Sequence, residues 1–112
     1  MKIGYNKVFE EDEVKRIIAD ELKKDETVKK TYKSEQIEKI RPEDIEFGQR
    51  GLLFRKTYGS VCLGKGNYIF LTKEDIEKMI VNYVKKENPH LSDLSEEDIF
   101  EYLDEYSWEI SY

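Results

Sequence analysis

A switch in hydrophobic period divides this chain into extended and helical parts. Apolar and β-forming residues alternate with polar ones from residue 44 to residue 71, and five of the six glycines fall in this stretch. Apolar residues spaced three and four apart precede and follow it. Period two is typical of a half-buried strand, and the longer spacing is typical of an amphipathic helix. Strands with tight reversals, bracketed by helices, indicate an α+β fold with an antiparallel sheet.

The extended stretch predicts a three- or four-stranded antiparallel meander. Runs of β-forming residues bounded by turn residues indicate where the strands lie. Glycine suits the reversals because it reaches positive φ without a steric penalty. The expected strands are residues 45–47, 52–58, 61–63 and 68–71, with reversals at Gly48, Gly51, Gly59, Gly64 and Gly66.

Two long helices are expected on either side of the meander. Residues 10–24 carry one apolar stripe, and the helix begins with acids and ends with lysines, as the helix dipole favours. Residues 72–86 repeat the apolar spacing after Thr72 and Asp75, which resemble a capping box. The two stripes are Val14, Ile17, Ile18 and Leu22, and Ile76, Met79, Ile80, Tyr83 and Val84.

Two shorter helices bring the expected number to three or four. Ser34 is expected to cap a helix that buries Ile37 and Ile40 and stops before Pro42, since the residue before a proline avoids the α region. Ser95 and Asp98 repeat the capping pattern ahead of Ile99, Leu103 and Tyr106. The acidic end is therefore expected to contain a helix.

The two ends of the chain alternate like strands. The final residues, YSWEISY, predict a closing C-terminal strand with Trp108 and Ile110 facing inward. Ile3 and Tyr5 predict a short strand near the start. With a length close to the commonest domain size, we expect residues 1–112 to form a single α+β domain.

Cysteine use and hydropathy indicate a cytoplasmic protein. Cys62 is the only cysteine, so no internal disulfide can form and a reducing compartment suffices. The sequence shows neither a signal-peptide h-region nor a run of 18 apolar residues, so we expect no membrane contact. The expected location is the cytosol, or the host cytosol if a phage encodes the chain.

Charge is divided unevenly along the chain. Residues 87–112 contain nine acids and no Lys or Arg, whereas residues 47–73 contain five basic residues and no acid. The net charge of −6 therefore conceals a basic, glycine-rich middle and an acidic end. Such asymmetry favours a charged partner.

Motifs for catalysis or cofactor binding are weak. Residues 59–66 match G-x-x-x-x-G-K, but glycine stands where a P-loop needs Ser or Thr, and a strand follows where a helix is needed. His90 is the only histidine and is interpreted as a surface residue, and Cys62 as a small apolar residue of a strand. We expect no cofactor, no metal and no catalytic residue. A small enzyme stays open, because spacing selects none of the 25 acids.

The acidic end offers a sharper hypothesis. A helix and strand that display carboxylates on a rigid backbone could enter a groove built for phosphates, which DNA presents about every 1.7 Å of its axis. Aromatic side chains nearby would anchor the contact. The candidate partner-binding residues are Glu96, Glu97, Asp98, Glu101, Tyr102, Asp104, Glu105 and Trp108.

Residues 95–112 resemble, in general character, the acidic helix-then-strand ends of small phage anti-CRISPR and other DNA-mimic proteins. The resemblance implies a non-enzymatic inhibitor encoded by a phage or mobile element. Its partner would be a positively charged nucleic-acid-binding protein or ribonucleoprotein complex. The simpler alternative is a solvated acidic surface that keeps the protein soluble.

Direct binding of DNA or RNA is the alternative function. The basic meander combines cations that could meet phosphates with rings that could stack on bases, as the wing of a winged-helix-like regulator or plasmid accessory protein would. Ser34–Arg41 would belong to its helical unit. Two further interpretations compete: an ordinary exposed sheet, and a basic surface on which the acidic end packs. The candidate nucleic-acid-binding residues are Arg50, Arg55, Lys56, Tyr58 and Lys65.

Overall fold

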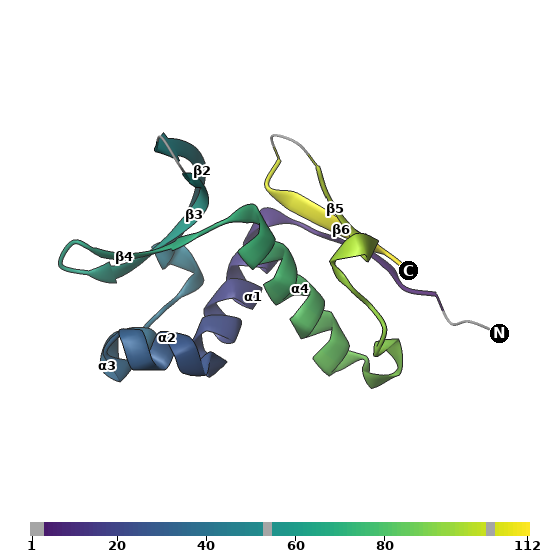
Figure 1. Cartoon of the computed structure of the whole chain (residues 1–112), viewed down its shortest axis with the longest axis horizontal. Helices are drawn as coiled ribbons and strands as arrows, with labels where there is room; N and C mark the ends of the chain where they lie inside the picture. Colours follow the sequence, from purple (N-terminus) through teal and green to yellow (C-terminus); the bar gives the residue numbers. More distant parts are fainter. Residues whose placement is uncertain (1–3, 53–54, 103–104) are drawn as a thin grey trace.

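Two long helices and two small sheets make up the architecture. The computed structural model describes residues 4–52, 55–102 and 105–112, with the backbone alone for residues 49–52 and 55–57. Helices α1 (Glu11–Lys24) and α4 (Lys73–Glu87) pack side by side, and a three-stranded antiparallel sheet lies over each side of the pair (Figure 1). The α+β prediction is confirmed.

The two long helices form where the sequence predicts them. Helix α1 buries its apolar stripe, and α4 begins with a complete capping box. The Asp75 backbone N–H donates to Thr72 Oγ1 at 3.1 Å, and the Thr72 N–H donates to the Asp75 carboxylate at 2.9 Å. Each bond satisfies a backbone donor that the first turn leaves without an intrahelical partner.

Two short helices follow α1. The first, α2 (Glu26–Thr31), is capped by Asp25, whose side chain accepts from the backbone N–H groups of Thr27 and Val28. The second, α3 (Ser34–Glu38), buries Ile37, but Lys33 is its N-cap and Ser34 is its first helical residue, contrary to the prediction. A 3-10 turn, η1 (Pro42–Asp44), then leads into the sheet.

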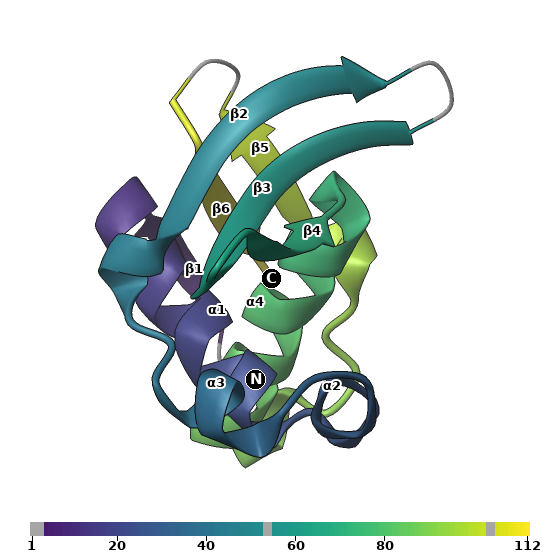
Figure 2. The same cartoon turned by 90° about the vertical axis from the view of Figure 1, so that its left-hand side faces the viewer.

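The first sheet is the expected meander, with three strands in the order β2-β3-β4: β2 (Ile45–Leu52), β3 (Arg55–Gly64) and β4 (Asn67–Leu71). Residues 55–58 and 61–63 belong to one long strand, so the reversal predicted at Gly59 is wrong (Figure 2). Gly48 and Gly51 likewise lie inside β2. The β3–β4 reversal is at Gly64-Lys65-Gly66, where all three residues have positive φ.

Gly59 has a different role from the turn glycines. A Cβ built on it would lie 3.2 Å from the ring of Phe47, which is its partner in β2. The absence of a side chain lets that ring lie flat across β3. Phe47 in turn stacks on Tyr106 with ring centroids 5.4 Å apart, which joins this sheet to the C-terminal hairpin.

The second sheet joins the two ends of the chain in the order β1-β6-β5: β1 (Asn6–Phe9), β5 (Ile99–Tyr102) and β6 (Ser107–Ser111). The closing strand is confirmed as β6, the central strand of the sheet. The N-terminal strand begins at Asn6, later than predicted, although Tyr5 and Tyr112 also exchange backbone hydrogen bonds. Ile3 is outside the described residues.

The helix predicted in the acidic end is wrong. The Ser95–Asp98 capping box does form, but it caps only the 3-10 turn η3 (Glu96–Asp98), and β5 follows at once. Ile99 and Glu101 face inward while Phe100 and Tyr102 face outward, which is the alternation of a strand. Between α4 and this turn, η2 (Pro89–Leu91) follows the break at Asn88 and buries Leu91.

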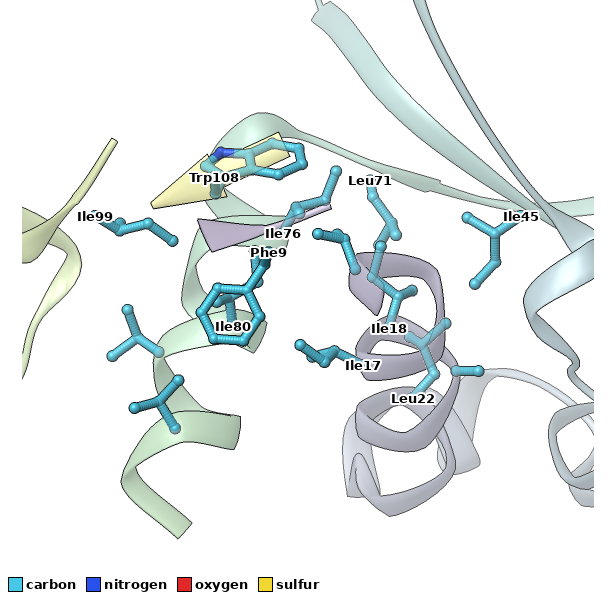
Figure 3. Close-up of a cluster of buried hydrophobic side chains, with 14 of the residues drawn as sticks. Phe9, Ile17, Ile18, Leu22, Ile45, Leu71, Ile76, Ile80, Ile99 and Trp108 are labelled. Atoms are coloured by element: carbon cyan, nitrogen blue, oxygen red, sulfur yellow. The ribbon is translucent and has the colours of Figure 1, made fainter. Parts of the chain in front are cut away.

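The core lies between the helix pair and the inner faces of both sheets. Trp108 and Phe9 from the second sheet lie toward Ile76 and Ile80 of α4 (Figure 3), and Ile110 belongs to the same buried cluster. Leu71 and Ile45 from the first sheet lie toward Ile18 and Leu22 of α1 (Figure 3). Buried side chains of this size each contribute about 1.5–3 kcal/mol of transfer free energy, so this core holds the two sheets in place.

Candidate functional site

The outer face of β1-β6-β5 exposes apolar side chains among acids. Val8, Glu109 and Phe100 form one row across the three strands. Val8 is 44%, Phe100 47% and Tyr102 37% exposed. The rings of Phe100 and Tyr102 lie 5.8 Å apart between centroids, and exposed neighbours of this kind are typical of contact sites.

An acidic hollow adjoins this row. A concave region of about 400 Å³ lies between the start of α1 and the β5–β6 hairpin. Among the described residues, all of its charged lining groups are acids. We call the exposed row and the hollow together the acidic sheet face, which comprises Val8, Glu10, Glu11, Asp12, Phe100, Tyr102, Glu105, Ser107 and Glu109.

Strand pairing explains why acids from both ends of the chain meet here. Because β1 pairs with β6 and leads directly into α1, the carboxylates of Glu10, Glu11 and Asp12 come beside Glu105. From the sequence alone, these N-terminal acids are expected only to favour the helix dipole. The short strand predicted from Ile3 and Tyr5 indicated that a strand precedes these acids, but no local pattern showed that it pairs with the closing strand.

Tyr102 is oriented by a neighbouring strand. Its hydroxyl donates to Glu109 Oε1 at 2.5 Å, and this hydrogen bond raises the pKa of the Tyr102 hydroxyl. The bond fixes the position of the hydroxyl, and Tyr102, which lines the hollow, is partly exposed. Tyr102 is thus the predicted aromatic partner-binding residue that lies on an accessible surface, whereas Trp108 is buried.

Glu101 and Trp108 are interior residues. Trp108 faces inward, as predicted for the closing strand, whereas the expectation that Glu101 lies on the exposed side of an acidic helix is wrong. Neither side chain lies on the surface that the partner-binding hypothesis needs. Trp108 is fully buried, and its indole N–H donates to Glu77 Oε2 at 3.0 Å. The Glu101 side chain is 5% exposed and lies 3.4 Å from Lys73 Nζ. Both side chains face inward because residues 99, 101, 108 and 110 share the inner side of the sheet.

A carboxylate pair therefore lies behind the acidic sheet face. Lys73 Nζ is 3.9 Å from Glu77 and 3.4 Å from Glu101, so one lysine of α4 links a helical acid to a strand acid. Burial raises the pKa of Glu77, against the lowering effects of Lys73 and of the Trp108 hydrogen bond. This cluster attaches the C-terminal hairpin to α4. Within the described residues, the Lys73–Glu101 ion pair joins the end of the basic middle to the acidic end of the chain.

The other predicted acids do not line up on one helix. Glu96 and Glu97 are exposed in η3, and Asp98 is half-buried because its carboxylate accepts from the Ser95 N–H. Glu105 lies beyond the opposite end of β5, and Asp104 is outside the described residues. The acids thus gather at the two ends of a four-residue strand.

The structure describes the side chains of only two residues of the nucleic-acid-binding alternative, Tyr58 and Lys65. The side chains of Arg50, Arg55 and Lys56 are outside the described part of the structure. Tyr58 is buried and meets Tyr106 and Trp108 edge-on, so stacking on a base is excluded for this ring. Lys65 is exposed at the β3–β4 reversal.

The P-loop-like segment, His90 and Cys62 form no recognisable catalytic or cofactor site among the described residues. Residues 59–64 continue β3 and a strand follows the single reversal, so the P-loop geometry is absent there, although only one turn forms where two were expected. His90 is exposed as predicted, and Cys62 is half-buried. In the described ranges, no three His, Cys, Asp or Glu side chains are arranged to hold a metal, and no helix is long and apolar enough to cross a membrane.

Comparison of the chain with protein-family models, with curated proteins and with solved structures finds no match.

Proposed function

We propose that the protein is a non-enzymatic binding protein whose acidic sheet face occupies a positively charged surface on a nucleic-acid-handling protein or ribonucleoprotein complex. The observation that carries the proposal is the meeting of four acids from two parts of the chain in one hollow. A rigid group of carboxylates complements a basic surface, speeds association and disfavours neutral partners.

The exposed apolar residues would supply binding free energy that charged groups alone do not. Buried aromatic anchors carry much of the energy at protein interfaces, whereas charges at a rim mainly set orientation and rate. Val8, Phe100 and Tyr102 stand beside the acids, so one contact would bury the rings while the carboxylates meet cations.

Occupation of a phosphate-binding surface would block nucleic acid from it. The protein would then act as an inhibitor by mimicry of DNA, encoded by a phage or mobile element, as the resemblance to anti-CRISPR proteins suggests. The mimicry would come from a sheet and a helix start, not from an acidic helix.

Capture from a bacterial lysate tests this proposal when it is combined with competition. Partners held electrostatically should be retained at about 50 mM salt and released near 300 mM, where charges are screened more strongly. Duplex DNA should displace them, because both ligands would use the same basic surface. Retention that duplex DNA leaves unchanged contradicts mimicry.

A charge-matched pair of variants locates the surface. Glu10→Lys with Glu105→Lys should abolish retention, because both acids line the hollow. Asp20→Lys with Glu87→Lys changes the charge equally at exposed sites elsewhere on α1 and α4 and should retain the partner. Equal loss in both variants would mean that net charge acts in place of a defined surface.

A further inference from the structure

A groove on the other side of the helix pair gathers basic side chains. It has a volume of about 590 Å³ and is lined by residues of the α3–η1 segment and of the β3–β4 reversal. Figure 1 shows α3 and β4 at its left. Ile40, Cys62 and Leu63 form its less polar part. We call it the basic groove; its charged lining residues are Lys33, Lys39, Arg41, Lys65, Glu35 and Asp44.

The cations of the groove are available to a ligand. In the described part of the chain, Lys33, Lys39 and Lys65 form no ion pair within 4 Å. Arg41 lies 3.7 Å from Glu43, but both side chains are largely exposed, so water weakens that pair. Asp44 is engaged locally, since its carboxylate accepts from the Arg41 backbone N–H at 3.0 Å. Four cations thus face two acids in a protein with a net charge of −6.

Two exposed rings lie on the adjoining strand. Tyr68 is 46% and Phe70 60% exposed, and their rings stack with centroids 6.1 Å apart and planes inclined by 24°. Tyr68 is the cross-strand partner of Cys62, and Phe70 is the partner of Ser60. Cross-strand partners point to the same side of a sheet, so the rings share the side of Cys62, whereas Leu63, the next lining residue of β3, points to the other side and packs against the core. The groove therefore lies at the end of the sheet that carries the rings and is lined by residues from both of its sides.

We propose that the basic groove and this ring pair bind single-stranded nucleic acid, with phosphodiester groups at the cations and unpaired bases on Tyr68 and Phe70. A positive groove beside stacking aromatics is the usual combination for single strands. An acidic peptide would use the cations but gain little from the rings. A duplex hides the faces of its bases, so the rings favour the unpaired state.

This site is independent of the acidic sheet face. It uses Lys65 from the sequence-based hypothesis, but its other cations come from the segment after α2. A strand held here would contact residues that the proposed protein contact does not use, so either site can fail without the other.

Fluorescence anisotropy with labelled oligo-dT and oligo-U of about 12 nucleotides tests the proposal at low salt, where phosphate contacts are strongest. We expect saturable binding of at least one oligomer, weaker binding of a duplex of equal length, and a linear fall of log affinity with log salt. The two oligomers also decide between DNA and RNA. No binding to either, or tighter binding to the duplex, would overturn the proposal.

Two double variants distinguish the contribution of the cations to affinity from that of the rings, and a third serves as the control. Lys39→Glu with Lys65→Glu should lower affinity at least tenfold and flatten the salt dependence, because fewer phosphates are contacted. Tyr68→Ala with Phe70→Ala should lower affinity about tenfold or more and keep the salt slope, because stacking is not ionic. The control, Lys24→Glu with Lys78→Glu, reverses two exposed charges outside the groove. Its affinity should be closer to that of the wild type than the affinity of either other double variant.

Folding of each variant is checked by circular dichroism, and binding is read only for folded proteins. A poly-glutamate peptide that competes as well as oligo-dT, together with unchanged affinity after loss of the rings, would show a general anion site and overturn the assignment.

Discussion

The two sheets carry similar outer faces but opposite charges. Each exposes neighbouring aromatic rings, Phe100 and Tyr102 on one and Tyr68 and Phe70 on the other. Acids surround the first pair, whereas the groove beside the second is lined mainly by cations. Net charge would place all of this protein among acidic proteins, but its binding chemistry differs from one sheet to the other.

The inner faces differ from the outer ones in what they contribute to stability. Inner aromatic residues such as Trp108 and Phe9 are fully buried and hold the sheets to α1 and α4. The outer rings are half-exposed and contribute less to the core. Substitutions that compare the two sides therefore separate folding from binding.

Replacement of Trp108 by alanine should give the largest effect. Loss of a fully buried large side chain costs about 3–5 kcal/mol of unfolding free energy. Phe100→Ala, on the opposite side of the same sheet, and Phe70→Ala, on the other sheet, should each cost below about 1 kcal/mol. Urea denaturation followed by circular dichroism measures all three. Similar losses would mean that the outer rings serve the fold.

Lys73→Met should produce the next largest loss, about 1–2 kcal/mol. A fully buried pair would cost more when broken, but the Lys73 side chain is 43% exposed, so solvent screens part of the interaction. Lys78→Met, on an exposed position of the same helix, should change little. Adding Glu101→Gln to Lys73→Met should recover part of the loss, and strict additivity would show that the two residues are not coupled.

Gly59→Ala should cost about 1 kcal/mol, because the added methyl group would meet the Phe47 ring at 3.2 Å and disturb its stack on Tyr106. Gly48→Ala is the matched control, since a Cβ there meets no described atom within 4 Å. Thermal unfolding compares the two. Equal melting temperatures would show that the contact between the sheets adapts without cost.

Glu77→Gln should have the smallest effect, visible as a pH dependence. Burial raises the pKa of Glu77 in the folded protein above its ordinary value of 4.5, while Lys73 and the Trp108 hydrogen bond lower it and Glu74 and Glu96 raise it. A carboxyl with a raised folded pKa contributes most to stability below the unfolded pKa, and this contribution is lost as the pH rises through the folded pKa.

Denaturation of wild type and Glu77→Gln between about pH 4 and pH 7 measures this. The stability of the wild type relative to the variant should fall with rising pH, because the raised pKa of Glu77 favours its protonated form in the folded protein. A relative stability that instead rises with pH would mean that Lys73 outweighs burial.

The long helices were predictable because several independent signals agree there. The spacing of apolar residues and the acidic first and basic last turns indicate the same two segments, and a capping box also marks the start of α4. Helix α2 was missed because none of its residues is buried, so it has no apolar stripe to detect. Its only strong signal was the Asp25 cap.

The acidic end was mispredicted because two patterns overlap. Residues 99, 103 and 106 have helical spacing, but residue 101, a buried acid, breaks the apolar alternation that would have shown a strand. A capping box specifies how a turn starts and not how far the helix continues. The acidic hollow was missed for another reason: it depends on the pairing of β1 with β6, which local sequence patterns do not encode.

The central position of β6 has a consequence for synthesis of the chain. About 100 residues separate β1 from β6, so at roughly 5–20 residues per second the ribosome needs on the order of 5–20 s to deliver the partner of β1. During this time β1 has an open strand edge, while β2-β3-β4 can already form from neighbouring segments. The acidic sheet face therefore exists only once the last strand has emerged, and incomplete chains would carry the basic side alone.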